Sequence, residues 1–216
     1  MKRSPIAYPG YPFVLGGVLL IFLGWALNST SLIIIGIAGC GFFAYFFRDP
    51  ERPVPGDDGD VVAPADGKVI FVDEVMEDRF LHGRARRVAI FMNVFDVHVN
   101  RAPVAGRVAA LEHRPGQFKA AFRGDADRVN EQQALVLETA GGGRVLAVQI
   151  AGLLARRIVP FVAQGRRLDR GERFGMICFG SRVDLYLPPN AEILVKVGDR
   201  VKAGSSLVAR LWLTAA

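Results

Sequence analysis

The sequence predicts a mainly β protein: a barrel/sandwich-hybrid-like β domain with short helices, preceded by an N-terminal apolar helical hairpin. Three observations support this fold class. Two apolar runs without charges fill residues 13–47. Beyond residue 60 the chain consists of short β-type runs broken by Gly, Pro and Asp, and no long helical periodicity competes with them. A chain of 216 residues, 51% of them hydrophobic, is long enough to bury one core and to carry an appendage.

The apolar runs cover residues 13–27 and 31–47 and are separated by a short polar turn. At about 1.5 Å per residue they reach roughly 22 and 26 Å, somewhat less than the ~30 Å hydrocarbon core of a bilayer. Thinning of the bilayer or extension by flanking residues closes that gap. We therefore predict a membrane hairpin over residues 13–47 after a basic segment over 1–12. A buried hairpin in a soluble protein, or one lying in a single leaflet, is the alternative.

Charges at the two ends of the hairpin predict its orientation. The flanking basic residues are Lys2, Arg3, Arg48 and Arg52. Positive charge on both sides places both ends in the cytoplasm, so we expect a cell-membrane protein whose β domain faces the cytoplasm. A cleaved signal peptide fits less well because a second apolar run follows directly. The two cysteines, Cys40 and Cys178, are too few for a disulfide framework and agree with a reducing compartment.

A Pro- and charge-rich linker over residues 48–60 precedes the β domain, which we place at residues 61–216. The expected strands lie within residues 68–75, 86–94, 106–114, 133–140, 144–152, 155–163, 181–188 and 191–204. Three glycines at 141–143 predict a hairpin turn, so the strands on either side of them should be antiparallel neighbours.

The C-terminal run VKVGDRVKAG, residues 195–204, resembles the β-hammerhead of lipoyl and biotinyl carrier domains. It supports an alternative function, that of a membrane-anchored carrier or adaptor module without enzymatic activity. No lysine stands in the Met-Lys context that such domains modify. The carrier chemistry itself is therefore not supported.

The formal net charge is +6, and arginines crowd one segment of the chain. Those we predict to contact lipid head groups or the membrane are Arg156, Arg157, Arg166 and Arg167. A basic surface suits nucleic acid or anionic lipid, and beside an apolar hairpin we expect anionic phospholipid and no nucleic acid. A solvated basic face without a specific partner is the alternative.

No metal site is expected. The three histidines, His82, His98 and His113, have no histidine partners at ligand spacing, and the cysteines are not paired. The sequence also lacks a Walker loop, a dinucleotide fingerprint and a G-x-S-x-G elbow.

Three polar islands lie beside apolar strands: PADGKV with Asp66, FDVHVNRAP with Asp96 and His98, and CFGSRVD with Gly180 and Ser181. Serine, histidine and aspartate are the components of an activated nucleophile. Each island alone is an ordinary turn or loop. A serine hydrolase built on Ser181, His98 and Asp66 is one interpretation, although it lacks a nucleophile elbow.

Together, FFRDPERP after the hairpin, PADGKV, FMNVFDVHVNRAPVAG, and FGS about 36 residues before the C-terminus resemble the phosphatidylserine decarboxylases, in their short, hairpin-anchored form. The likeness extends over about residues 46–211. It implies a proenzyme that cuts itself between Gly180 and Ser181 into a β chain, 1–180, and an α chain, 181–216. It also implies decarboxylation of phosphatidylserine to phosphatidylethanolamine through a Schiff base with a pyruvoyl group made from Ser181, without a metal, and a homodimer. Archaetidylserine is an alternative substrate.

The resemblance also assigns roles to individual residues. Ser181 is the nucleophile and pyruvoyl precursor, His98 the base and later proton donor, and Asp66 the residue that orients His98. Arg101 stands where longer relatives carry a second histidine, so Arg101 and His113 are supporting candidates. Asp96 competes with Asp66 as the orienting residue because residues i and i+2 of a strand share a face.

Overall fold

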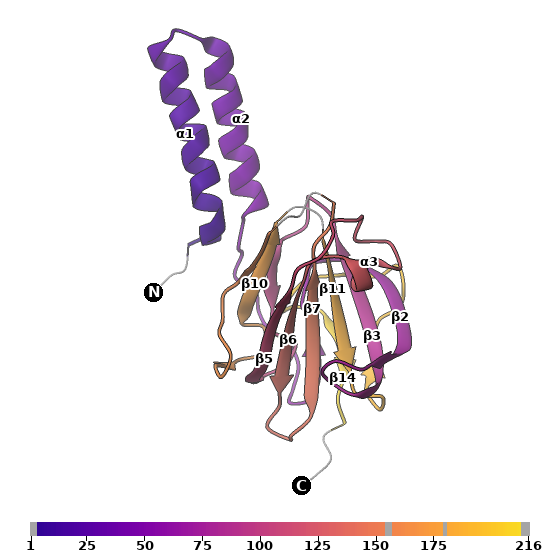
Figure 1. The fold of residues 1–216 in the computed structure, drawn as a ribbon. Coiled ribbons are helices and arrows are strands. Elements are labelled where there is room, and N and C mark those ends of the chain that lie inside the picture. Colours follow the sequence, from indigo (N-terminus) through magenta and orange to yellow (C-terminus); the bar gives the residue numbers. More distant parts are fainter. Residues whose placement is uncertain (1–3, 154–156, 179–180, 213–216) are drawn as a thin grey trace. The chain divides into compact units, whose positions relative to one another are not determined.

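The structure is a computed structural model in which residues 4–153, 157–178 and 181–212 are described. The chain forms two compact units, Met1–Glu51 and Arg52–Ala216. The first consists of helices and the second is built almost entirely of strands (Figure 1).

The first unit confirms the predicted pair of apolar helices. Its elements are η1 (Tyr8–Gly10), α1 (Tyr11–Ala26) and α2 (Thr30–Phe46). Asn28 adopts a left-handed conformation, with φ of 51°, in the turn between α1 and α2. Among the described residues, Tyr8–Ala26 is the one helical stretch both long and apolar enough to cross a membrane, because α2 has only 17 residues.

Glycine lets α1 and α2 pack closely. A Cβ placed on Gly17 would lie 2.5 Å from the Cys40 Sγ, and one on Gly24 would lie 2.8 Å from the Ile33 backbone N. Small residues at such contacts are typical of helix pairs in membranes.

The second unit contains one eight-stranded antiparallel sheet and two three-stranded sheets. The large sheet has the order β13 (Arg200–Val201), β2 (Gly67–Glu77), β3 (Gly83–Met92), β11 (Ser181–Leu187), β7 (Arg144–Ile150), β6 (Gln132–Glu138), β5 (Gly106–Arg114) and β9 (Arg167–Leu168). The small sheets are β1 (Asp60–Val62), β14 (Leu207–Arg210) and β12 (Glu192–Ile193), and β4 (Val99–Arg101), β10 (Arg173–Cys178) and β8 (Arg157–Pro160). A single short helix of the described residues, α3 (Ala126–Val129), interrupts the strands. The mainly β fold class is therefore confirmed.

The β6–β7 hairpin forms as predicted from its glycines. Glu138 pairs with Arg144 across the antiparallel register, and Gly142 has a φ of +76° in the turn. The run expected over residues 191–204 instead divides into β12 and β13. Gly198, with a φ of +103°, sits in the turn that separates them.

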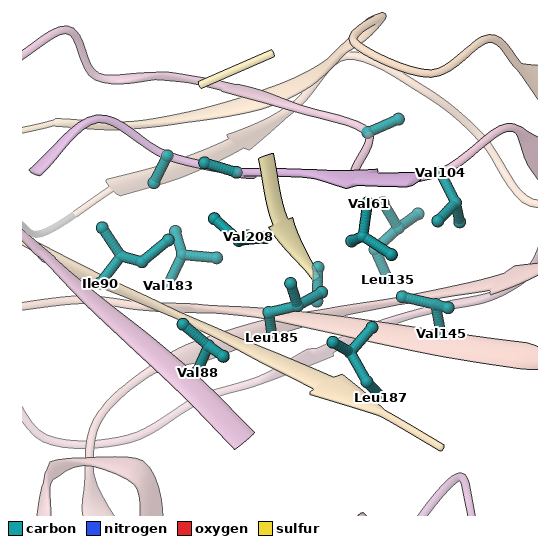
Figure 2. Close-up of a cluster of buried hydrophobic side chains, with 14 of the residues drawn as sticks. Val61, Val88, Ile90, Val104, Leu135, Val145, Val183, Leu185, Leu187 and Val208 are labelled. Carbon is teal, nitrogen blue, oxygen red and sulfur yellow. The ribbon is translucent and has the colours of Figure 1, made fainter. Parts of the chain in front are cut away.

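Both faces of the central strand β11 are covered, and all seven of its residues are buried. On the inner face, Val183, Leu185 and Leu187 pack with Val61 and Val208 from the small β1–β14 sheet (Figure 2). On the outer face, Tyr186 packs in a second cluster that includes Ala126 of α3. Burial of each large aliphatic side chain contributes about 1.5–3 kcal/mol to folding.

Antiparallel pairing defines two ends of the large sheet. At one end β11 begins, with Ser181 paired to Met92 and Arg182 paired to Ile150, where β3 and β7 finish. We call this the Ser181 end. At the opposite or far end, Leu187 pairs with Arg86, and the β6–β7 turn closes the sheet.

Candidate active site

Ser181 is the first residue of β11 and has no exposed surface. Its Oγ finds no hydrogen-bond partner among the described residues. A buried hydroxyl left in that state costs about 1–3 kcal/mol, so it is uncommon where structure alone is at stake. Gly180, the other half of the predicted cleavage site, lies outside the described residues.

His98 is fully buried immediately before β4. Its Nδ1 lies 3.0 Å from the Asp96 carbonyl oxygen. Because a carbonyl can only accept, Nδ1 carries the proton in the neutral ring and Nε2 is the nitrogen that can take up a proton. The His98 carbonyl accepts from the Ile177 backbone N at 3.3 Å, which ties the histidine to β10 just ahead of the predicted cleavage site.

Asp96 positions His98 through its main chain. Its Oδ2 accepts from the Asn93 backbone N at 2.9 Å, and its Oδ1 pairs with Arg200 at 3.3 Å. Residues 94–96 form a turn, so the expectation that Asp96 and His98 share the face of a strand is wrong. The turn bends the chain there, and Asp96 contacts the imidazole through its carbonyl oxygen, whereas its carboxylate accepts from the Asn93 backbone N.

Asp66 lies just before β2, and its side chain is only 10% exposed. Its carboxylate pairs in bidentate fashion with Arg52, with Nη2 to Oδ2 at 2.8 Å, and accepts from the Ala203 backbone N at 2.8 Å. Among the described residues these are its only partners. Asp66 thus joins the start of the second unit to β2, and its role in orienting His98 stays a prediction.

The two supporting candidates lie in different surroundings. Arg101 is buried in β4 and donates to the Gly171 carbonyl oxygen at 3.1 Å. His113 is exposed on β5 and pairs with Glu131 at 3.2 Å. Three strand-to-strand steps separate β5 from β11, or about 14 Å at the usual strand spacing. The structure therefore brings His98, and not His113, to β10, the strand that ends shortly before Ser181 in the sequence.

The four arginines predicted to contact lipid do not form one cluster. Arg156 lies outside the described residues, and Arg157 is exposed in β8 opposite Cys178. Arg167 pairs with Arg107 at the far end, and Arg166 forms an ion pair of 2.5 Å with Glu172. Neighbours in the sequence separate here because β8 and β9 belong to different sheets. Their contact with lipid stays a prediction.

An amide pair on the inner face was not predicted. Gln149 and Asn100 are both fully buried, and the Gln149 Nε2 donates to the Asn100 Oδ1 at 2.7 Å. The Asn100 Nδ2 in turn donates to the sulfur of Met92, the residue paired with Ser181, at 3.5 Å. The Gln149 Oε1 has no partner in the described part of the chain. In the sequence, the one signal was a glutamine inside the otherwise apolar run VLAVQI.

A buried ion pair follows Ser181 directly and was also missed. Arg182 and Asp184 have no exposed surface, and Arg182 donates to both carboxylate oxygens at 2.6 and 2.5 Å. Burial raises the pKa of the Asp184 carboxyl, and the hydrogen bonds and charge of Arg182 oppose that shift. Arg182 also donates to the Arg123 carbonyl oxygen at 3.0 Å, so the start of β11 is held from its outer face.

Cys178 ends β10 two residues before the predicted cleavage site and is buried. Desolvation raises the pKa of its thiol to about 11. The interior near the start of β11 is therefore poorly hydrated, which strengthens any electrostatic interaction formed there.

Comparison with known proteins gives a consistent result. The family model for phosphatidylserine decarboxylase matches residues 40–209. A protein of Symbiobacterium thermophilum named phosphatidylserine decarboxylase proenzyme is 53% identical over 98% of both chains. Proteins of the same name from Pelobacter propionicus and Desulfotalea psychrophila are 45% and 42% identical, each covering 97% of this chain and 98% of their own.

Proposed function

The chain belongs to the phosphatidylserine decarboxylase family, and on this basis we propose that it decarboxylates phosphatidylserine with a pyruvoyl group made from its own Ser181. The observation that carries the proposal is the buried Ser181 hydroxyl, which lacks a hydrogen-bond partner among the described residues. The relatives' name, proenzyme, agrees with a precursor that must be processed.

Self-cleavage begins at this hydroxyl. The Ser181 Oγ loses its proton to a base and attacks the Gly180 carbonyl carbon, and breakage of the peptide C–N bond leaves an ester and a free amine on residue 181. Elimination then breaks the Cβ–O bond, so Gly180 departs as a carboxylate and residue 181 becomes dehydroalanine. Tautomerisation and hydrolysis with one water release ammonia and leave a pyruvoyl group at the new N-terminus.

His98 is the proposed base. It acts through Nε2, because the Nδ1–H group is engaged in a hydrogen bond to the Asp96 carbonyl oxygen. Its carbonyl bond to Ile177 keeps it beside β10, the strand that leads to the cleavage site. The family motif implies a supporting role for Asp66, which we propose here; its carboxylate binds the Arg52 guanidinium and accepts from the Ala203 backbone N.

The surroundings of Ser181 fit a pyruvoyl group. The inner face beside it is apolar apart from the amide pair, and the buried hydroxyl has no hydrogen bond to other described residues that its conversion would break. Such a group supplies a ketone that combines with the substrate amine and accepts the electrons released when carbon dioxide leaves. Around it, the chain's own residues exclude water, and Arg182 and Asp184 hold the start of β11 in place.

Cleavage need not separate the two products, 1–180 and 181–216. In the sheet β11 is hydrogen-bonded to β3 on one side and to β7 on the other, and β14 pairs with β1. The α chain therefore remains part of both sheets without the peptide bond at its N-terminus.

We further propose that the apolar helices anchor the protein in the cell membrane, with the β domain in the cytoplasm. The basic residues that flank the helices support this orientation through the positive-inside rule. A homodimer is expected from the family resemblance alone.

The intact mass of the denatured protein tests the proposal, with Ser181→Ala measured beside the wild type. Two wild-type fragments are expected, the smaller of 36 residues with a ketone in place of its N-terminal amine, together with one uncut mutant chain. Borohydride should add two hydrogens to the small fragment only. A single uncut wild-type chain would overturn the pyruvoyl mechanism. Labelling of that uncut chain by a serine-directed reagent would indicate a hydrolase, and no labelling would favour an adaptor.

A further inference from the structure

Three large apolar side chains project from loops at the Ser181 end of the sheet. Phe95 is 67% exposed, Phe122 is 60% exposed and Leu153 is 62% exposed. Their loops follow β3, β5 and β7, all of which finish at this end. Single exposed apolar residues are ordinary, but a group of them on one surface marks a site of contact. We call these three side chains the rim.

Contacts beneath the rim connect its loops. The Phe122 ring packs edge-on against Phe91 of β3, with centroids 5.9 Å apart. The buried Asn130 side chain donates to the Lys119 carbonyl oxygen at 2.8 Å and to the Ala151 carbonyl oxygen at 2.7 Å. These bonds link the loop that carries Phe122 to the loop that carries Leu153.

The rim is also tied to the predicted active site. Arg182, which follows Ser181, donates to the Arg123 carbonyl oxygen at 3.0 Å and to the Ala121 carbonyl oxygen at 3.4 Å. The backbone on both sides of Phe122 is thus held by the residue next to the proposed nucleophile. Phe122 is therefore exposed on a loop whose backbone is held in place by hydrogen bonds from Arg182.

Positive charge surrounds the rim. Lys119 and Arg123 flank Phe122 and share one carboxylate, that of Asp125, at 3.2 and 3.3 Å. Lys68 and Arg157 are exposed at this end, and neither has a carboxylate partner in the described ranges. An apolar centre with an excess of cations around it matches the surface of a bilayer that contains anionic lipid.

The far end of the sheet offers an internal control. Trp212 is 62% exposed there, directly after Leu211, which lines a cavity with the β6–β7 turn. Cations are present there too, with Arg107 opposite Arg167 in the strand register. One aromatic side chain, Trp212, does not repeat the group of three large apolar side chains that makes up the rim.

We propose that the rim inserts into the surface of an anionic bilayer, so that the β domain docks on lipid through its own loops in addition to the apolar helices. The inference rests on the proposed function, because it explains how a lipid head group reaches Ser181. A two-chain lipid exposes a large apolar area to water when it leaves the bilayer, so the head group must be met at the interface. The chain also enters the β domain at this end, where Arg52 binds Asp66 beside the start of β2.

Lipid-dependent quenching tests the contact without catalysis. Full-length protein carrying Ser181→Ala and Cys40→Ala is reconstituted into phosphatidylcholine vesicles with about a quarter phosphatidylglycerol. A fluorophore is attached at Phe122→Cys, or at Trp212→Cys as the control, while the buried Cys178 stays in place. Nitroxide-labelled lipid should quench the fluorophore at 122 severalfold more than the one at 212, and omission of phosphatidylglycerol should reduce the difference. Equal quenching at both positions would overturn the proposal.

Turnover then tests what the contact is for. In the cleavable protein, Phe95→Ser with Phe122→Ser should lower the rate on vesicle phosphatidylserine by about tenfold or more, and change the rate on a monomeric short-chain analogue less than about twofold. Trp212→Ser should affect neither. Equal losses on both substrates would show damage to the site and overturn the inference.

Two further outcomes separate the alternatives. Wild-type protein inactive on both substrates would overturn the proposed function. The quenching result would still decide whether the rim contacts lipid. Shielding of position 122 from lipid, together with a dimer that Phe122→Ser dissociates, would show that a second copy covers the rim and would overturn the proposal.

Discussion

The two faces of β11 treat buried polar groups in opposite ways. On the inner face, the Ser181 hydroxyl and the neighbouring Gln149 oxygen have no hydrogen-bond partners among the described residues. On the outer face, Arg182 and Asp184 satisfy each other in a bidentate pair. All of these residues are completely buried. Burial therefore does not separate the faces, whereas the degree of hydrogen bonding does.

The difference indicates a division of labour along one strand. A satisfied buried pair fixes geometry, because breaking it leaves an uncompensated charge. An unsatisfied hydroxyl lowers stability slightly and stays available for a reaction. Alternation along a strand places the two kinds of residue next to each other in sequence and on opposite faces. Ser181, the proposed nucleophile, is thereby adjacent to Arg182, which holds the start of the strand.

Replacement of Ser181 should cause the largest loss of activity with the least loss of stability. Ser181→Ala is expected to abolish self-cleavage and lower decarboxylation by at least about 10³-fold, because the nucleophile is lost. The melting temperature should not fall below that of the self-cleaved wild type, because the variant keeps its chain uncut and the precursor Oγ has no hydrogen-bond partner among the described residues. Gel electrophoresis and thermal melts check both halves. A drop of more than about 5 °C would mean that the side chain at position 181 is part of the stabilising network.

The outer face should show the opposite pattern. In the uncut Ser181→Ala background, Asp184→Asn or Arg182→Met is expected to cost about 3–5 kcal/mol in the free energy of unfolding, because each deprives a buried charge of its bidentate partner and leaves it only a longer contact, Arg182 with Asp127 or Asp184 with Arg87. The double change Arg182→Met with Asp184→Leu should recover much of that loss. Denaturant titration measures all three variants. If the single variants were as stable as the background, the buried pair on the outer face would not stabilise the fold and the two faces would not differ in this respect.

The thiol of Cys178 reports how dry the region near the start of β11 is. Its pKa, raised to about 11 from 9.0, leaves roughly 10⁻³ of the thiol ionised at pH 8, compared with about 10⁻¹ for an ordinary cysteine. Alkylation by iodoacetamide should therefore be about 100-fold slower than at an exposed Trp212→Cys control, and should speed up until the pH nears 11. Equal rates at pH 8 would show that water reaches this region.

The smallest effects are expected in the amide pair. Gln149→Leu removes the unpartnered Oε1 but leaves the Asn100 Oδ1 without its donor, so stability should change by less than about 1 kcal/mol. Asn100→Leu leaves the whole Gln149 amide unpartnered and should cost about 1–3 kcal/mol. Denaturant titrations of the two variants compare these costs. The reverse order would mean that Gln149 is the better-satisfied member of the pair.

Much of the fold followed from local patterns in the sequence. The runs now seen as β2, β3, β5, β6 and β7 were readable from their apolar content, and the glycines at 141–143 identified their hairpin. Both signals are properties of neighbouring residues. The presence of Ser181 and His98 in one site was expected from family resemblance and from no local rule.

Other features could not be predicted from the sequence, because they depend on which distant segment covers each strand and on which sheet each strand joins. The run SRVDLYL reads as a strand with Arg182 and Asp184 facing solvent, but the segment that contains α3 covers that face. Arg157 and Arg167 looked like neighbours because they are close in sequence, yet they belong to different sheets. Tertiary contacts of this kind leave no trace in the spacing of residues.

The position of β11 in the chain has a consequence for the order of events during synthesis. The strand lies between β3 and β7, but the ribosome makes it only at residues 181–187, about 140 residues after α2 ends at Phe46. At roughly 5–20 residues per second, α2 precedes β11 by some 7–28 s. The apolar helices are therefore available to enter a membrane well before the central strand can complete the sheet. On the proposed mechanism, Ser181 is thus made well after the apolar helices, so self-cleavage would follow their entry into the membrane.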